Sequence, residues 1–70
     1  MRKNFLRKLR RRLSYSQAEL AEKAHCSRAT IILVERLCHY PTRKVRNRLA
    51  SALGVSESVI WPSLEASDDK

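Results

Sequence analysis

The chain has 70 residues, with 15 Lys and Arg, 7 Asp and Glu and a single glycine. This length fits one small domain and excludes a two-domain enzyme. The hydrophobic content of 43% is close to the globular average of roughly 45–50%, so we expect a folded core and not wholesale disorder. A chain this short buries only about 60% of its surface on folding, and dimerisation is a natural supplement to so thin a core.

The net charge of +8 is unevenly distributed along the chain. Residues 1–48 hold 14 basic and 3 acidic side chains, a net charge of +11, whereas residues 49–70 hold 1 basic and 4 acidic side chains, a net charge of −3. This polarity indicates that the first two thirds contact a polyanion, most often nucleic acid and less often an anionic membrane surface. The alternative is a solvated surface whose charge only maintains solubility.

Neither an export signal nor a membrane span is visible in the sequence. Cations recur through residues 1–13, where a signal peptide needs an unbroken apolar run. The longest apolar run, 31–34, is far shorter than the roughly 20 residues of a membrane helix. We therefore expect a cytoplasmic protein whose two cysteines stay reduced.

Glycine and proline are so scarce that they divide the chain into helix-length segments, and no alternating strand pattern is present, so we expect an all-α fold. The first helix is predicted from about residue 2 or 4 to 12. Its apolar face consists of Phe5, Leu6, Leu9 and Leu13.

The second helix begins after Ser16, which forms a capping box with Glu19. The stripe on its buried face consists of Leu20, Ala21 and Ala24.

Only three residues separate the second helix from a third, which Ser27 caps and which is predicted over 28–37. A turn of this length joins the two helices of helix-turn-helix units, in which the second helix enters the DNA major groove.

The second half of the chain predicts two further helices. Thr42 caps a helix over 43–53, and Gly54 fits the left-handed residue that ends it. A short fifth helix is predicted over 57–61, and residues 63–70 form a flexible acidic tail.

This arrangement resembles the Cro and phage-repressor (XRE-type) helix-turn-helix family over about residues 5–62. The resemblance rests on residues that stand in the order and spacing of the family pattern: Gln17, Leu20, Ala21, Ser27, Ile31, Glu35, Leu49, Ala50, Leu53, Gly54 and Val55. It implies a compact five-helix, lambda-repressor-like domain over 1–62, with the helix-turn-helix unit at about 16–37. It also implies a bacterial or phage-encoded protein that associates with the nucleoid.

The resemblance also implies a set of DNA contacts. Gln17 would hold a phosphate, and Arg43 and Lys44 would approach the DNA backbone. The positions implied to read base edges, at the exposed start of the third helix, are Ser27, Arg28, Ala29, Thr30, Ile32 and Leu33. General chemistry agrees for Gln17, because free N–H groups and the dipole at a helix start bind phosphate. An arginine at position 28 can pair bidentately with guanine or contact a phosphate, and both interpretations stay open.

Other positions extend the resemblance or depart from it. Arg10 and Glu35 stand where phage repressors of this type have an intramolecular ion pair. His25 stands where the turn usually has a left-handed glycine, at a cost on the order of 1 kcal/mol. Ile32 and Leu33 are apolar where polar residues are commoner, so this face contacts either thymine methyl groups or a protein. Leu37 stands where the family often has a glycine, so we expect the third helix to extend further or to end less sharply.

Other chemistry finds little support in the sequence. The His–Cys pair at 25–26 and the Cys–His pair at 38–39 would lie about 15 Å apart if a helix separates them, too far for one zinc ion. No glycine-rich phosphate loop is present, and we expect no catalysis, no metal and no cofactor. Binding of the cationic first helix to a membrane surface is disfavoured, because its apolar residues are needed to cover the core.

The sequence therefore predicts a sequence-specific regulator of transcription that binds double-stranded DNA, most simply a repressor that occupies a promoter. A homodimer would bind a near-palindromic site with half-sites about 34 Å apart. The dimer contact is predicted at four apolar residues of the C-terminal end: Val59, Ile60, Trp61 and Leu64. The alternative for Trp61 is closure of the core of its own protomer. The alternative function is a protein-interaction module, antitoxin-like or an anti-regulator, that uses Ile32 and Leu33.

Overall fold

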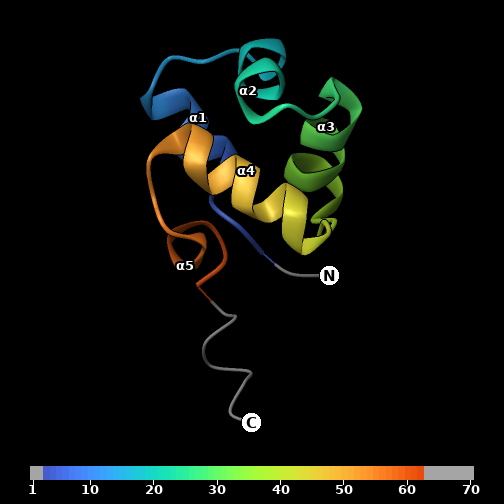
Figure 1. Cartoon of the computed structure of the whole chain (residues 1–70), viewed down its shortest axis with the longest axis vertical. Coiled ribbons are helices and arrows are strands. Elements are labelled where there is room, and N and C mark those ends of the chain that lie inside the picture. The colour runs from blue at the N-terminus through green and yellow to red at the C-terminus, as the bar shows by residue number, and fades with distance from the viewer. Residues whose placement is uncertain (1–2, 63–70) are drawn as a thin grey trace, which may run out of the picture.

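The computed structural model describes residues 3–62, and within this range the chain forms five helices and no strand (Figure 1). The helices are α1 (Leu6–Arg12), α2 (Gln17–Ala24), α3 (Arg28–Leu37), α4 (Arg43–Leu53) and α5 (Glu57–Ile60). α2 packs against α3 and α4, while α1 contacts α3 and α5 contacts α4. The predicted all-α fold is therefore confirmed. Of the helices described, none is long and apolar enough to cross a membrane.

Side-chain caps set where α2, α3 and α4 begin. Ser16 Oγ accepts a hydrogen bond from the Glu19 N–H at 3.0 Å, and Glu19 Oε1 accepts one from the Ser16 N–H at 2.7 Å. Ser27 and Thr42 accept in the same way from the N–H three residues further on. These bonds satisfy N–H groups that a helix start leaves unpaired. The predicted starts of all three helices are confirmed.

Left-handed residues end the same three helices. They are His25 (φ 56°) after α2, Cys38 (φ 55°) after α3 and Gly54 (φ 71°) after α4. The expectation that α3 would extend further or end less sharply was wrong, because Cys38 takes the left-handed conformation and its N–H bonds to the Leu33 carbonyl. A residue with a side chain is strained there by roughly 1–2 kcal/mol. Both ends of the segment that contains α3 are therefore under backbone strain.

α1 begins at Leu6, later than the sequence pattern suggested, and its N-cap residue Phe5 makes no side-chain cap bond. Asn4 stands one residue before that cap. Its Oδ1 accepts from the Leu6 N–H at 3.0 Å, and its Nδ2 donates to the Val34 carbonyl at 3.0 Å. The Phe5 N–H donates to the Ile60 carbonyl at 2.9 Å. The segment before α1 is thus tied to both α3 and α5.

Apolar residues from all five helices form one core. The largest fully buried side chains are Trp61, Leu6, Leu20, Ile31, Leu49, Ile60 and Val34. Ile60 and Trp61, which were predicted at a dimer contact, are thus enclosed by their own protomer. Val59, with 44% of its surface exposed, is the residue of that prediction that remains open to a partner. Leu64, its fourth member, lies outside the described residues.

Arg46 holds the connector between α3 and α4 in place. Its Nη1 donates to the Pro41 carbonyl at 2.8 Å and its Nε donates to Glu57 Oε1 at 3.1 Å. The guanidinium carbon lies 4.4 Å from the centroid of the Tyr40 ring, and that ring packs edge-on against Trp61. Arg46 of α4 therefore ties the connector to both α4 and α5.

Replacing His25 with glycine should stabilise the protein, because glycine adopts the left-handed backbone of the turn without steric cost. The greater freedom of glycine in the unfolded chain offsets part of this gain. We expect the free energy of unfolding, measured by urea denaturation, to rise by about 0.5–1 kcal/mol. A His25→Gly protein that unfolds at a lower urea concentration than the wild type would contradict the assigned backbone.

The matched control for this measurement is Gly54→Ala. Apart from Gly54 and its two chain neighbours, no residue has an atom within 4 Å of a Cβ added at Gly54, so this substitution reports backbone strain without steric overlap. We expect it to lower the free energy of unfolding by about 1 kcal/mol, opposite in sign to the change at His25.

Candidate nucleic-acid interface

α2 packs against α3 through small side chains. Ala21 and Ala24 of α2 are buried in the same cluster as Ile31 and Val34 of α3. The three-residue turn between the helices then fixes their relative direction. Burial of one side of α3 leaves its opposite side at the surface, as the helical spacing predicted.

The start and the outer side of α3 are open to solvent. Of the six positions predicted to read base edges, four are exposed, namely Ser27, Arg28, Ala29 and Leu33. Thr30 and Ile32 are half-buried, and the hydroxyl groups of Ser27 and Thr30 lie 2.9 Å apart. The structure therefore leaves four of the six residues open to solvent and covers Thr30 and Ile32 in part.

Cations stand at helix starts, where an isolated helix would favour acids. Arg28 begins α3, and Arg43 and Lys44 begin α4; all three side chains are exposed. In the described chain, the first turns of these two helices contain no acidic residue. The partial positive charge of a helix start opposes a neighbouring cation by about 0.3–1 kcal/mol. Cations at a helix start reduce stability in the free protein, but together with the helix dipole they attract an anion such as phosphate.

Arg10 and Glu35, which were predicted to pair, are joined by two hydrogen bonds. The Nε of Arg10 lies 2.7 Å from Glu35 Oε2, and Nη2 lies 3.1 Å from Oε1. Arg10 Nη1 also donates to the Tyr15 carbonyl at 2.7 Å. The side chains of Arg10 and Glu35 are only 12% and 2% exposed. The pair therefore fixes α1, the segment that follows it and α3 relative to one another.

Gln17, the predicted phosphate ligand, is the first residue of α2 and is half-buried. Its Nε2 donates to Glu35 Oε1 at 3.3 Å. This bond uses one of the two amide hydrogens, and the other remains for an acceptor outside the protein. The ion pair thus also orients the Gln17 side chain.

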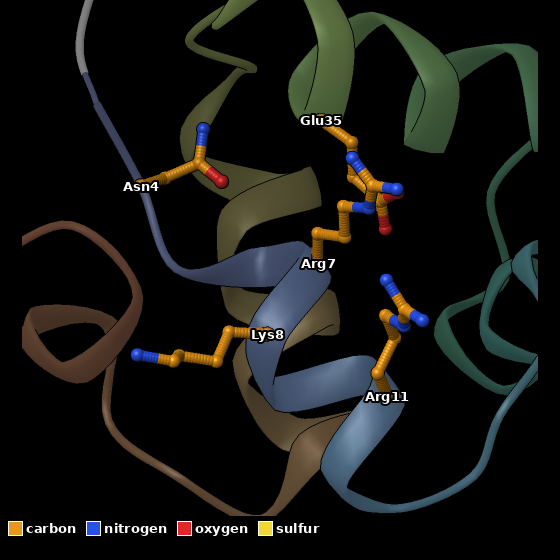
Figure 2. Close-up of a pocket in the computed structure, with 5 residues that line it drawn as sticks. All are labelled: Asn4, Arg7, Lys8, Arg11 and Glu35. Carbon is orange, nitrogen blue, oxygen red and sulfur yellow. The ribbon is translucent and has the colours of Figure 1, made fainter.

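A basic groove between α1 and α3 is a feature that the sequence analysis missed. It consists of two adjoining pockets, both lined by Arg7 and Glu35; Arg11 lines one and Arg36 the other. Figure 2 shows the side chains of Arg7 and Arg11 directed toward Glu35, whereas Lys8, which also lines the pocket, extends away from Glu35. The i, i+4 spacing of Arg7 and Arg11 was a signal that they share one face of α1. That α3 adds Arg36 to this face depends on how the helices cross.

Cys26, in the turn between α2 and α3, contributes packing and not reactivity. Burial raises the pKa of its thiol, and nearby Arg48 offsets part of that rise. The thiol is therefore protonated at neutral pH and behaves as a small apolar side chain. Arg48 also donates to the His25 carbonyl at 3.3 Å, which links α4 to the strained turn.

Solved structures with a similar fold include two DNA-related proteins. The chain resembles the N-terminal DNA binding domain of SinR from Bacillus subtilis, with a TM-score of 0.71 and 24% identity over 93% of this chain and 90% of that one. It also resembles a hypothetical transcription factor, NHTF, from Neisseria, with a TM-score of 0.71 and 27% identity over 86% of this chain and 70% of that one. No curated protein matches the chain.

A family model described as helix-turn-helix matches residues 6–60, which include all five helices. This range is most of the chain, and it contains the capped starts of α2 and α3 and the Arg10–Glu35 pair. The chain therefore belongs to the XRE-type helix-turn-helix family of DNA-binding transcription regulators.

Proposed function

We propose that the chain is a sequence-specific regulator that inserts the start of α3 into the major groove of double-stranded DNA. The observation that carries this proposal is the set of exposed cations at two helix starts, Arg28 on α3 and Arg43 and Lys44 on α4. Free backbone N–H groups, the helix dipole and a side-chain charge coincide at these points. Such sites suit the phosphates that flank a groove occupied by a helix.

The predicted contacts take distinct roles in this proposal. Gln17 holds a phosphate with its remaining amide hydrogen, and Arg43 and Lys44 contact the backbone without reading sequence. Arg28 pairs with a guanine or with a phosphate, and the exposed Leu33 contacts a thymine methyl group.

The proposal includes the domain limits and the assembly. The proposed DNA-binding domain is residues 1–62; the acidic tail predicted at 63–70 lies outside the described residues. A homodimer binds a near-palindromic operator with half-sites about 34 Å apart, and it represses by occupying a promoter. The exposed Val59 supports a dimer contact at the C-terminal end, whereas Ile60 and Trp61 are buried within their own protomer.

A second candidate function is a protein-interaction module of the antitoxin or anti-regulator type. The observation that favours it is the apolar surface along α3, where Leu33 is 41% exposed and Leu37 is 60% exposed. These residues are four apart, so they lie on one face of the helix. Exposed apolar patches on small domains often bind protein.

The experiment that tests the proposed function is selection of DNA from a random duplex pool. The protein and the labelled pool are separated by gel filtration, and the DNA that elutes with the protein is sequenced. A recurrent, near-palindromic sequence bound by two protomers supports the proposal. Recovery of unenriched DNA would overturn sequence-specific recognition.

Binding to duplex DNA should depend strongly on salt, because the contacts displace counterions from phosphates. If about six phosphates are neutralised, the logarithm of the association constant should fall against the logarithm of salt concentration with a slope near −5. Fluorescence anisotropy with a labelled duplex over a range of KCl concentrations measures this slope. A flat response would remove DNA as the main partner.

Arg28→Ala and Lys44→Ala should have different consequences. Loss of a bidentate guanine contact at Arg28 should weaken binding to the selected duplex by about 1–3 kcal/mol and leave a shuffled duplex almost unaffected. Lys44→Ala should weaken both duplexes about equally and reduce the salt slope by about 1. Lys23→Ala, at an exposed position on α2, is the control for loss of one charge. An equal effect of Arg28→Ala on the two duplexes would assign Arg28 to a phosphate.

Leu33→Ala distinguishes the two functions proposed for the α3 surface. If Leu33 contacts a thymine methyl group, the substitution should weaken binding to the selected duplex and leave the oligomeric state unchanged. Titration with the duplex and analytical ultracentrifugation measure the two properties. Unchanged DNA affinity together with lost self-association would show that this face binds protein.

A further inference from the structure

The groove between α1 and α3 holds more positive charge than the folded protein neutralises. Arg7 and Arg11 line it from α1, and Arg36 lines it from α3. Glu35, which lines both of its halves, already accepts hydrogen bonds from Arg10 on both carboxylate oxygens. Within residues 3–62, no ion pair joins Arg7, Arg11 or Arg36 to a carboxylate. Three guanidinium groups thus border one groove with no acid to balance them.

The arrangement of these groups suits phosphate. Arg7 and Arg11 are four residues apart on one face of α1, about 6 Å apart along the helix axis. Figure 2 shows both side chains reaching from α1 toward Glu35 on α3. The fork of N–H groups on a guanidinium pairs bidentately with two phosphate oxygens. Two such groups at this spacing can each contact a different phosphate.

The groove adjoins the predicted phosphate ligand of α2. Gln17 lines one half of it together with Arg7, Arg10 and Arg36. Under the proposed function Gln17 holds a phosphate of the operator, so the DNA backbone reaches the mouth of the groove. From there the groove continues past Arg7 to Arg11.

We propose that this groove is a second phosphate-binding surface, which takes the DNA backbone just outside the half-site that α3 reads. The inference rests on the proposed function. Contacts of this kind add affinity without reading sequence and make the bound stretch of DNA longer than the recognised one. The occupant is therefore duplex DNA next to the operator.

A membrane surface fits α1 less well than a duplex does. Helices that bind a bilayer surface need a continuous apolar face opposite their cations. Leu6 of α1 is fully buried, and Leu9 packs against the core from the same helix. The exposed apolar residues of this region, Phe5 and Leu13, stand at opposite ends of α1.

The test compares two double variants that each remove two positive charges. Arg7→Gln/Arg11→Gln removes the two arginines of α1 that line the groove, and Arg12→Gln/Lys23→Gln removes two cations that line neither of its pockets. All four side chains are exposed, so both proteins should fold like the wild type, as thermal melting by circular dichroism can check.

Binding is measured by fluorescence anisotropy with a labelled duplex of mixed sequence, about three helical turns long, over a range of KCl concentrations. The groove variant should reduce the salt slope by about 2 per protomer and weaken binding at 0.1 M salt by at least about 10-fold. The control variant should change the slope by less than about 1. Arg7→Lys/Arg11→Lys keeps both charges and should retain most of the slope.

The other outcomes overturn the inference in distinguishable ways. Equal effects of the two double variants would mean that the groove is not a phosphate site, while the proposed function would stand. A wild-type protein that binds no duplex would overturn both. If Arg7→Gln/Arg11→Gln leaves duplex binding unchanged and abolishes binding to phosphatidylglycerol vesicles, the surface contacts a membrane and not DNA.

Discussion

The half-buried pair of Arg10 and Glu35 is the contact on which the arrangement of the first three helices depends. It joins α1 to α3 directly, and it reaches the Tyr15 carbonyl and the Gln17 amide through further hydrogen bonds. Desolvation of a charge costs several kcal/mol unless a partner compensates it, so loss of Arg10 would remove the closest cation from a carboxylate whose side chain is only 2% exposed. The side chains proposed to face DNA are therefore positioned by a contact that lies beneath them.

Features that depend on residues close in sequence could be predicted, and features that depend on helix crossing could not. Ser27 and Thr42 identify helix starts because a cap acts on an N–H only three residues away. The left-handed Cys38 carries no such signal, since cysteine has no preference for that backbone. The bond from Asn4 to the Val34 carbonyl spans 30 positions and requires knowledge of how α1 meets α3. The same limit explains why the basic groove was missed.

In the candidate site, too, the features set by local sequence could be predicted and those set by helix packing could not. Helical periodicity placed Ile31 inside and Ile32 and Leu33 outside. Ile31 is buried and Leu33 is exposed, while Ile32 is half-buried. Burial of Ile60 and Trp61 depends on how α5 closes over α4, and periodicity over a four-residue helix says little about that. The cations at the starts of α3 and α4 conflict with the helix dipole, and such local conflicts are common where a protein binds a ligand.

The contacts of Arg46 have a consequence for how the two ends of the protomer communicate. One guanidinium holds the Pro41 carbonyl, just before the helix start that carries Arg43 and Lys44, and also the Glu57 carboxylate of α5. If α5 shifts when the proposed dimer forms, Arg46 would move with Glu57, and the start of α4 with Arg43 and Lys44 would move too. Coupling of this kind is reciprocal, so DNA that seats the connector would also favour one position of α5. Assembly and operator occupancy would then be coupled through the single side chain of Arg46.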